Sequence, residues 1–276
     1  MPKGYIVDVE FTWGFQSSII GLSKTPPSFY YPPPTTFLGA LAESIARNMN
    51  IGEDKGRAII PALSRELLAI GLRPINCIPL RYEDLNRIVA IKKTAGKLYP
   101  RVDDLKGSFD SPARGKTSLS TLNGNNPTVR FFTVFKDGEI NLEMHEVKLS
   151  KDHFWKIHRL GSKESRVSVV NVIETYLLPN EMKRTITNYS FPALNGIKTV
   201  EVVNHKWEVE KYVDPFKIEK YDKSENPIIN YIRGYGILPF YLPILTGIVF
   251  QPKYLVELDN GFSAYKYNDE VVIGYG

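Results

Sequence analysis

The chain has 276 residues, 43% of them hydrophobic and 24% charged, a composition typical of a folded globular protein and not of a disordered chain. Its net charge of +5 favours an anionic partner. Cys77 is the only cysteine, which excludes an intramolecular disulfide and a cysteine-based zinc site and favours a reducing, cytoplasmic location. The start of the chain has no signal-peptide pattern, and the most apolar run, 237–250, is too short and too proline-interrupted to span a membrane.

The first part of the chain is predicted to form one strand and two helices. Apolar and polar residues alternate over Tyr5–Trp13, which predicts a strand. Three prolines then lead into a helix at about 36–49, for which Thr35–Thr36 supply side-chain oxygens that can cap backbone N–H groups. A second helix is predicted at Ile59–Ile70, ending at Gly71.

The middle of the chain alternates regular and irregular segments. Strands are predicted at Ile75–Tyr82 and Leu85–Lys92. Residues 94–127 lose periodicity, and a loop of that length is usually functional or disordered. A hairpin is then predicted from Val129–Phe135 and Glu139–Val147 around a Lys-Asp-Gly turn.

A short helix at about 151–160, capped by Ser150 and ended by Gly161, and a strand at Arg166–Leu178 complete this series. The order β-α-(α)-β-β-α-β is that of a ferredoxin-like or RRM-like βαββαβ core. The predicted fold class is therefore α+β, with a long insertion in the core and a β-rich C-terminal part.

The predicted domain organisation follows from that order. Residues 1–180 form an RRM-like domain with the insertion at about 94–127, and residues 181–276 form a β-rich C-terminal region. In that region Thr199–Val213 alternates, and Phe240, Tyr241 and Phe250 are predicted to lie in the core.

The insertion is the first candidate nucleic-acid site. Between Arg87 and Lys116 the chain has eight Lys or Arg residues and three Asp. The candidate RNA-binding residues in and beside the insertion are Lys92, Lys93, Lys97, Arg101, Arg114 and Lys116, interleaved with Tyr99 and Phe109. Cations that neutralise phosphates and rings that stack on bases are typical of single-stranded RNA binding. The alternative is a solvated, flexible loop.

The second candidate site is the turn between the predicted short helix and the strand that follows it. Its glycine lets a backbone approach closely, its hydroxyls and amides can bond phosphate oxygens, and its cations add charge. The candidate residues are His158, Arg159, Gly161, Ser162, Lys163 and Ser165. The alternative is a glycine helix cap followed by a polar turn.

Two motifs together resemble a known family. Tyr-Pro-Pro-Pro-Thr-Thr-Phe-Leu-Gly-Ala-Leu-Ala at 31–42 and Arg-Leu-Gly-Ser-Lys-Glu-Ser-Arg-Val at 159–167 look like those of CRISPR-associated protein family five. These proteins are RAMP subunits of type I Cascade interference complexes. The archaeal type I-A branch is the most similar, because Trp13-Gly14 and the Leu-Ser-Lys-Thr at 22–25 also fit its N-terminal region.

The resemblance implies a non-catalytic subunit that binds the 5′ handle of the guide RNA (crRNA) in antiviral defence. It implies that the insertion is a "thumb" reaching toward the backbone subunit, and that the turn at 161–165 is the glycine-containing loop of the family. The implied partners are the crRNA, the backbone subunit, the large subunit and, indirectly, target DNA. The resemblance implies no cofactor, metal or membrane.

One branch of the family cuts precursor crRNA without a metal, which is the alternative function. Such cleavage needs a base for the 2′-OH and an acid for the leaving oxygen. His158, Lys156 and Tyr31 are the candidate set for these roles. A third alternative is a scaffold that binds only protein.

Overall fold

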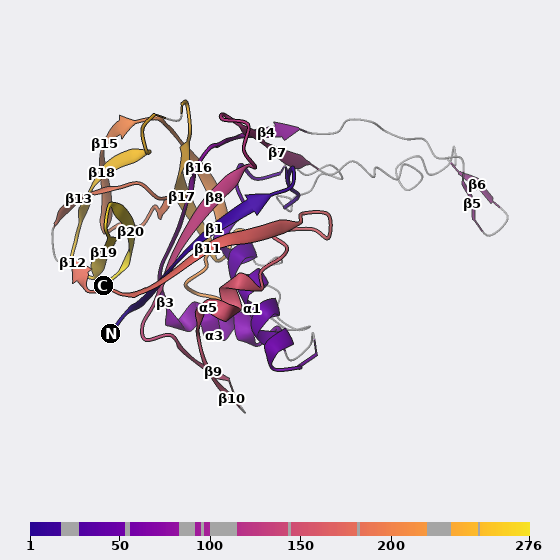
Figure 1. Ribbon diagram of the computed structural model, residues 1–276, viewed down its shortest axis with the longest axis horizontal. Helices are drawn as coiled ribbons and strands as arrows, with labels where there is room; N and C mark the ends of the chain where they lie inside the picture. The colour runs from indigo at the N-terminus through magenta and orange to yellow at the C-terminus, as the bar shows by residue number, and fades with distance from the viewer. Residues whose placement is uncertain are drawn as a thin grey trace.

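The computed structural model has an α+β fold, as the sequence predicts (Figure 1). The structure describes residues 1–17, 28–52, 56–82, 92–94, 97–99, 115–142, 145–180, 183–219, 233–247 and 249–276. Its helices are α1 (Pro34–Asn48), α3 (Ile59–Glu66) and α5 (Lys151–Trp155).

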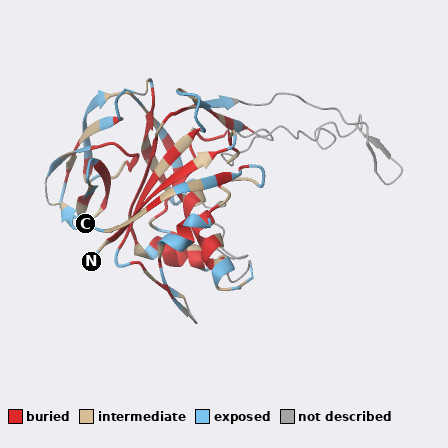
Figure 2. Cartoon of the chain, viewed as in Figure 1, coloured by how far each residue is buried: buried red, intermediate tan, exposed pale blue. Residues whose placement is uncertain are grey.

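The largest sheet in the described residues has seven strands in the order β11-β1-β8-β3-β20-β19-β12. Its strands are β1 (Lys3–Phe11), β3 (Leu67–Pro74), β8 (Thr128–Phe135), β11 (Val167–Tyr176), β12 (Pro179–Asn180), β19 (Phe262–Tyr267) and β20 (Glu270–Tyr275). Every neighbouring pair is antiparallel. The inner strands are buried on both faces (Figure 2), because helices cover one face and C-terminal residues cover much of the other.

The helices attach to the sheet through stacked aromatic rings. Phe37 of α1 stacks on Phe131 of β8 with ring centroids 4.4 Å apart, and Phe154 of α5 stacks on Tyr5 of β1 at 4.3 Å. The apolar residues of α1 recur at helical spacing and are buried against the same core. These contacts fix α1 and α5 on one face of the sheet, and α3 packs beside α1.

Helix α1 begins two residues earlier than predicted, and the expected threonine cap is absent. Pro33 is at the N-cap position, Pro34 is the first helical residue, and no side chain caps the end. Proline suits the first helical position because its fixed φ is helical and its missing N–H would have no partner there. Thr35 and Thr36 are therefore inside the helix.

The second helix ends at Glu66, so the prediction of helix through Ile70 is wrong. Residues 67–74 form β3, which is paired with β8 and buried on both faces. Gly71, expected to end the helix, is inside this strand. A Cβ there would lie 2.6 Å from the Ser190 carbonyl oxygen, so a crossing segment requires the glycine.

The predicted hairpin between 129–135 and 139–147 is also wrong. Strand β8 pairs with β1 on one edge and β3 on the other, so neither edge is open to a hairpin partner. Instead β9 (Glu139–Leu142) pairs with β10 (His145–Lys148). Helix α5 ends at Trp155 and not near residue 160. Ser150 is at its N-cap position as predicted, and the Ser150 backbone N–H donates to His153 Nδ1 at 3.2 Å.

Part of the insertion is regular. Strand β7 (Lys116–Thr121) pairs with β4 (Cys77–Tyr82) and with β2 (Gly14–Phe15) in a three-stranded sheet. The prediction of an aperiodic segment through residue 127 is therefore wrong at β7. Short strands β5 (Lys92–Thr94) and β6 (Lys97–Tyr99) pair with each other, while 100–114 lies outside the described residues.

The C-terminal region is β-rich. Two further sheets have the orders β13-β18-β15 and β14-β17-β16. Their strands are β13 (Arg184–Thr187), β14 (Phe191–Pro192), β15 (Ile197–Asn204), β16 (Lys206–Val213), β17 (Ile237–Ile244) and β18 (Lys253–Leu258). Phe240 is buried as predicted, whereas Phe250 is 69% exposed and is not a core residue.

Strands from both sides of residue 180 share the largest sheet, since β19 and β20 extend it beyond β3. On the face away from the helices, a row of polar residues crosses five strands. Arg130 bonds the Asp8 carboxylate and Glu270, and Arg73 bonds Glu270 at 2.6 Å, while Asn171 bonds Asp8 at 3.1 Å. This row connects β11 at one end to the C-terminal strand β20 at the other.

Candidate nucleic-acid interface

The turn at 158–167 follows α5 and is closed by its own backbone. Leu160 N–H donates to the Ser165 carbonyl at 3.0 Å, and Arg159 and Arg166 form an isolated β-bridge. Gly161 has φ +119°, and a Cβ there would lie 2.7 Å from the Gln16 carbonyl oxygen. Glycine is required at this position both for its backbone conformation and for the close approach of residue 16.

The same turn is anchored to the chain that follows β2. Gln16 N–H donates to Ser165 Oγ at 2.8 Å, and Ser162 N–H donates to the Gln16 carbonyl at 3.0 Å. Trp13 Nε1 donates to the Glu164 carbonyl at 3.2 Å. Ser165 is fully buried, and its hydroxyl, by accepting the Gln16 N–H, holds the turn in place.

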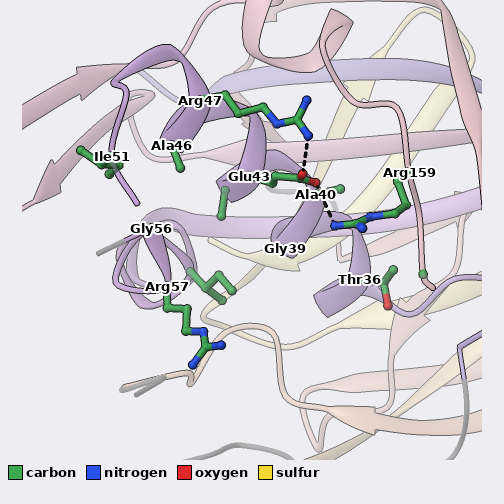
Figure 3. Close-up of a pocket in the computed structure, with 13 residues that line it drawn as sticks. Thr36, Gly39, Ala40, Glu43, Ala46, Arg47, Ile51, Gly56, Arg57 and Arg159 are labelled. Atoms are coloured by element: carbon green, nitrogen blue, oxygen red, sulfur yellow. Dashed lines mark hydrogen bonds and ion pairs between the residues drawn. The ribbon is translucent and has the colours of Figure 1, made fainter. Parts of the chain in front are cut away.

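A pocket of about 760 Å³ opens beside this turn (Figure 3). Three segments line it: one face of α1, the chain from residue 56 into α3, and the turn after α5. The lining residues are Thr36, Gly39, Ala40, Ala42, Glu43, Ala46, Arg47, Ile51, Gly56, Arg57, Ile60, Arg159 and Gly161. The lining residues of α1 share one face of the helix because they recur at helical spacing. Most of them are small, so they leave room beside the charged side chains of Glu43 and Arg47.

The charges of the pocket are arranged around Glu43. Figure 3 shows its carboxylate between two guanidinium groups, with Arg47 at 2.9 Å and Arg159 at 3.3 Å. Arg57 lines the opposite wall. The described lining therefore carries three guanidinium groups and one carboxylate. Guanidinium groups suit phosphate because they donate in a planar fork.

Further basic side chains lie at the rim of this pocket. Lys156 Nζ donates to Asn48 Oδ1, and His158 Nε2 lies 3.4 Å from Arg47 Nη2. The Lys163 side chain is 84% exposed. Trp155, at the end of α5, is 46% exposed, unusual for a tryptophan without a partner surface.

The structure therefore brings the second predicted cluster together. His158, Arg159, Gly161, Ser162 and Lys163 lie on one turn beside the pocket. Arg47 and Arg57 were not predicted as site residues, because they come from segments about a hundred residues earlier in the chain. Arg47 is recognisable in the sequence only as the i,i+4 partner of Glu43.

The first predicted cluster is described only in part. Lys116 is exposed at the start of β7. The side chains of Lys92, Lys93 and Lys97 lie outside the described residues, as do Arg101 and Arg114 entirely.

The three alternative catalytic residues do not form one site. Tyr31 is fully buried, and its hydroxyl lies 3.5 Å from the Cys77 carbonyl. Burial raises the pKa of Tyr31 well above its ordinary value. Tyr31 precedes the first turn of α1, whereas His158 contacts Arg47 in the last turn. These two turns are about 20 Å apart along the helix axis, at 1.5 Å per residue.

A second polar centre joins the proline tract to the insertion. The buried Glu210 carboxylate accepts from Tyr30 N–H at 3.0 Å and from the Tyr212 hydroxyl at 2.7 Å. Arg81, at the end of β4, lies 3.5 Å from Glu210 and 3.8 Å from the centre of the Tyr30 ring. Burial raises the pKa of Glu210 to about 7 against the opposing effect of these donors. No sequence signal marked this residue.

Among the described residues, no helix is both long and apolar enough to cross a membrane. In the same part of the chain, no group of three or more His, Cys, Asp or Glu residues is arranged to hold a metal ion.

Comparison with known proteins identifies the family. A curated protein of *Saccharolobus solfataricus*, CRISPR-associated protein Cas5 2, is 25% identical over 277 residues, which cover 99% of this chain and 96% of that protein. A crystal structure of a CRISPR protein from *Archaeoglobus fulgidus* is 46% identical, with a TM-score of 0.74, and covers 99% of this chain and all of that one. No protein-family model matches the chain. The chain belongs to the Cas5-like CRISPR-associated proteins, which confirms the resemblance in its motifs.

Proposed function

We propose that the protein is the RNA-binding subunit of an archaeal type I-A Cascade complex, that it is not itself a nuclease, and that it holds the 5′ handle of the crRNA. The observation that carries the proposal is the pocket in which Arg47, Arg57 and Arg159 meet beside the Gly161 turn. In this proposal the protein works in the cytoplasm and contacts the backbone and large subunits, and meets target DNA only through them.

The order of the core strands supports a ferredoxin-like core. Strand β8 lies between β1 and β3 and is antiparallel to both, so β1 and β3 run parallel with α1 and α3 in the connection between them. Strand β11 follows α5 and pairs with the other edge of β1. This is a split βαβ arrangement used twice.

The position of the insertion supports a thumb. The β4–β7 pair leaves the core between β3 and β8, the slot that separates the second and third core strands. In this proposal Lys92, Lys93, Lys97, Arg101, Arg114 and Lys116 contact RNA phosphates along the insertion.

The chemistry of the rim supports RNA over a protein partner. Arginine and lysine side chains neutralise phosphates, while an exposed aromatic ring such as that of Trp155 can stack on an unpaired base. The separation of Tyr31 from His158 argues against the nuclease alternative. Cleavage of repeat RNA in EDTA that a His158→Ala change abolishes would reverse this part of the proposal.

The proposed function is tested by the salt dependence of RNA binding. The variant Arg159→Gln with Lys163→Gln removes two cations beside the pocket. The slope of log K against log salt is negative, and each lost phosphate contact reduces its magnitude by about 0.7 for single strands. We therefore expect the variant to bind handle RNA more weakly, with a slope whose magnitude is smaller by about 1.4.

The matched control removes two exposed lysines of the C-terminal region, Lys198→Gln with Lys253→Gln, and is expected to bind with an unchanged slope. Equal slopes for the first variant and the wild type would contradict the proposed interface.

A further inference from the structure

Gly39 is in the middle of α1, where glycine is unfavourable. A glycine inside a helix destabilises it relative to alanine, because glycine loses more backbone freedom on folding. A Cβ built on Gly39 would meet no atom within 4 Å, and its φ is not in the left-handed region. Nothing in the described structure therefore requires the absence of a side chain at this position.

The other two glycines of the pocket differ from Gly39. A Cβ on Gly56 would lie 3.1 Å from Ala46 Cβ, and Gly161 combines a positive φ with the close Gln16 carbonyl. The packing of the chain accounts for both. Of the three, only Gly39 borders space that no described residue fills.

The space above Gly39 has the properties of a ligand site. The pocket volume of about 760 Å³ is within the range of about 300–1,000 Å³ found for small-ligand pockets. Its floor on α1 is made of Gly39, Ala40 and Ala46. These side chains are small, so a flat ring can lie against the helix. Its walls carry Arg47, Arg57 and Arg159, which attract an anion.

We propose that this pocket receives one unstacked nucleotide of the guide RNA, with its base lying on α1 over Gly39 and its phosphate on the arginines. This inference rests on the proposed function. A free anion would use only the arginines, whereas a nucleotide uses both the arginines and the small-residue floor. Single-stranded RNA offers such a nucleotide, because its unpaired bases can be splayed out of the stack.

Glu43 acts in this site as a positioning residue. Its carboxylate bonds Arg47 and Arg159, and so holds two guanidinium groups on the same side of α1 before any ligand arrives. An arginine that is already oriented loses less side-chain freedom when it binds.

The test uses the full chain in its reconstituted complex, with guide RNAs that carry an abasic site at each handle position in turn. For the wild type we expect one position at which the missing base weakens assembly about tenfold, as the loss of one stacked base does. The variant Gly39→Leu fills the pocket, so we expect it to bind intact RNA about tenfold more weakly and to lose the difference between intact and abasic RNA at that position.

Two further variants separate a filled pocket from a damaged fold. Gly39→Ala is expected to raise the melting temperature and yet weaken binding several-fold, a combination that general damage does not produce. Gly247→Leu is the matched control, because Gly247 also has open space around its Cβ and does not line the pocket, and it is expected to bind as the wild type does.

Handle RNA that binds normally but shows no sensitive position, together with normal binding by Gly39→Leu, would overturn the pocket proposal and leave the proposed function standing. Failure of the wild type to bind handle RNA at all would overturn both.

Discussion

At the scale of single residues, Glu210 is held in an environment that opposes its charge. It is 6% exposed, and burial outweighs its three donors, so its pKa rises to about 7. The carboxylate nevertheless connects the Tyr30 backbone, the Tyr212 hydroxyl and Arg81. One titratable side chain therefore connects the segment that leads into α1 to β4, the strand that precedes the insertion.

The stability of the protein is expected to depend on pH through Glu210. Between the unfolded pKa of about 4.5 and the folded pKa of about 7, the native state binds a proton that the unfolded state has released, so rising pH lowers stability across this window. Gln cannot ionise, so the melting temperature of Glu210→Gln relative to the wild type is expected to rise from about pH 5 to about pH 8. A difference that stays constant over this range would refute the raised pKa.

At the scale of elements, the turn after α5 depends on the two residues that flank β2. Gly161, Ser162 and Ser165 all contact Gln16, and Trp13 contacts the same turn. The arginine at the start of the turn is thus positioned by a segment about 150 residues away in the chain. The candidate binding residues are therefore presented by a turn that its own bonds and the chain around residue 16 hold in place.

Removal of the Ser165 hydroxyl is expected to act on stability first. Ser165→Ala leaves the Gln16 N–H without its acceptor, which is expected to cost about 1–3 kcal/mol of unfolding free energy in a denaturant titration. Ser168→Ala on β11 is the matched control, because the Ser168 side chain is exposed, and its change is expected to stay within about 0.5 kcal/mol. Equal effects of the two changes would remove the anchoring role of Ser165.

Some elements could be predicted from sequence because their patterns are local. The first strand alternates cleanly, and α1 has apolar residues at helical spacing after a proline start. Strand β3 could not be separated from α3, because Leu67–Leu72 continues an apolar run in which both faces are buried, and such a run fits either structure. The hairpin predicted at β8 is wrong because β8 pairs with β1 and β3, which are distant in sequence, and a local pattern does not show such partners.

The candidate site was predictable only where its residues are consecutive. The turn at 158–166 carries its own signal of glycine, hydroxyls and cations. The pocket does not, because Arg47, Arg57 and Arg159 meet only when α1, α3 and the turn pack together. Burial of Ser165 was equally hidden, since its partner Gln16 is far away in sequence.

At the scale of the whole molecule, the two faces of the largest sheet are used differently. Helices cover one face, and the basic pocket lies on that side (Figures 1 and 3). Part of the other face is covered by Leu177 and Tyr189, which lie outside its strands and pack in one cluster with Ile6 and Phe132 of the sheet. An RNA that bound the open sheet face, as in many RRM domains, would meet this covering.

The central claim is that the guide RNA handle lies against the turn after α5 and α1. Its most direct test is photo-cross-linking of the assembled complex, with handle nucleotides labelled one at a time and the cross-linked peptides identified by mass spectrometry. The account predicts cross-links from the handle to peptides that contain residues 36–47 and 155–166 of this chain. Handle cross-links confined to other subunits, or to the face that carries Tyr189, would contradict it.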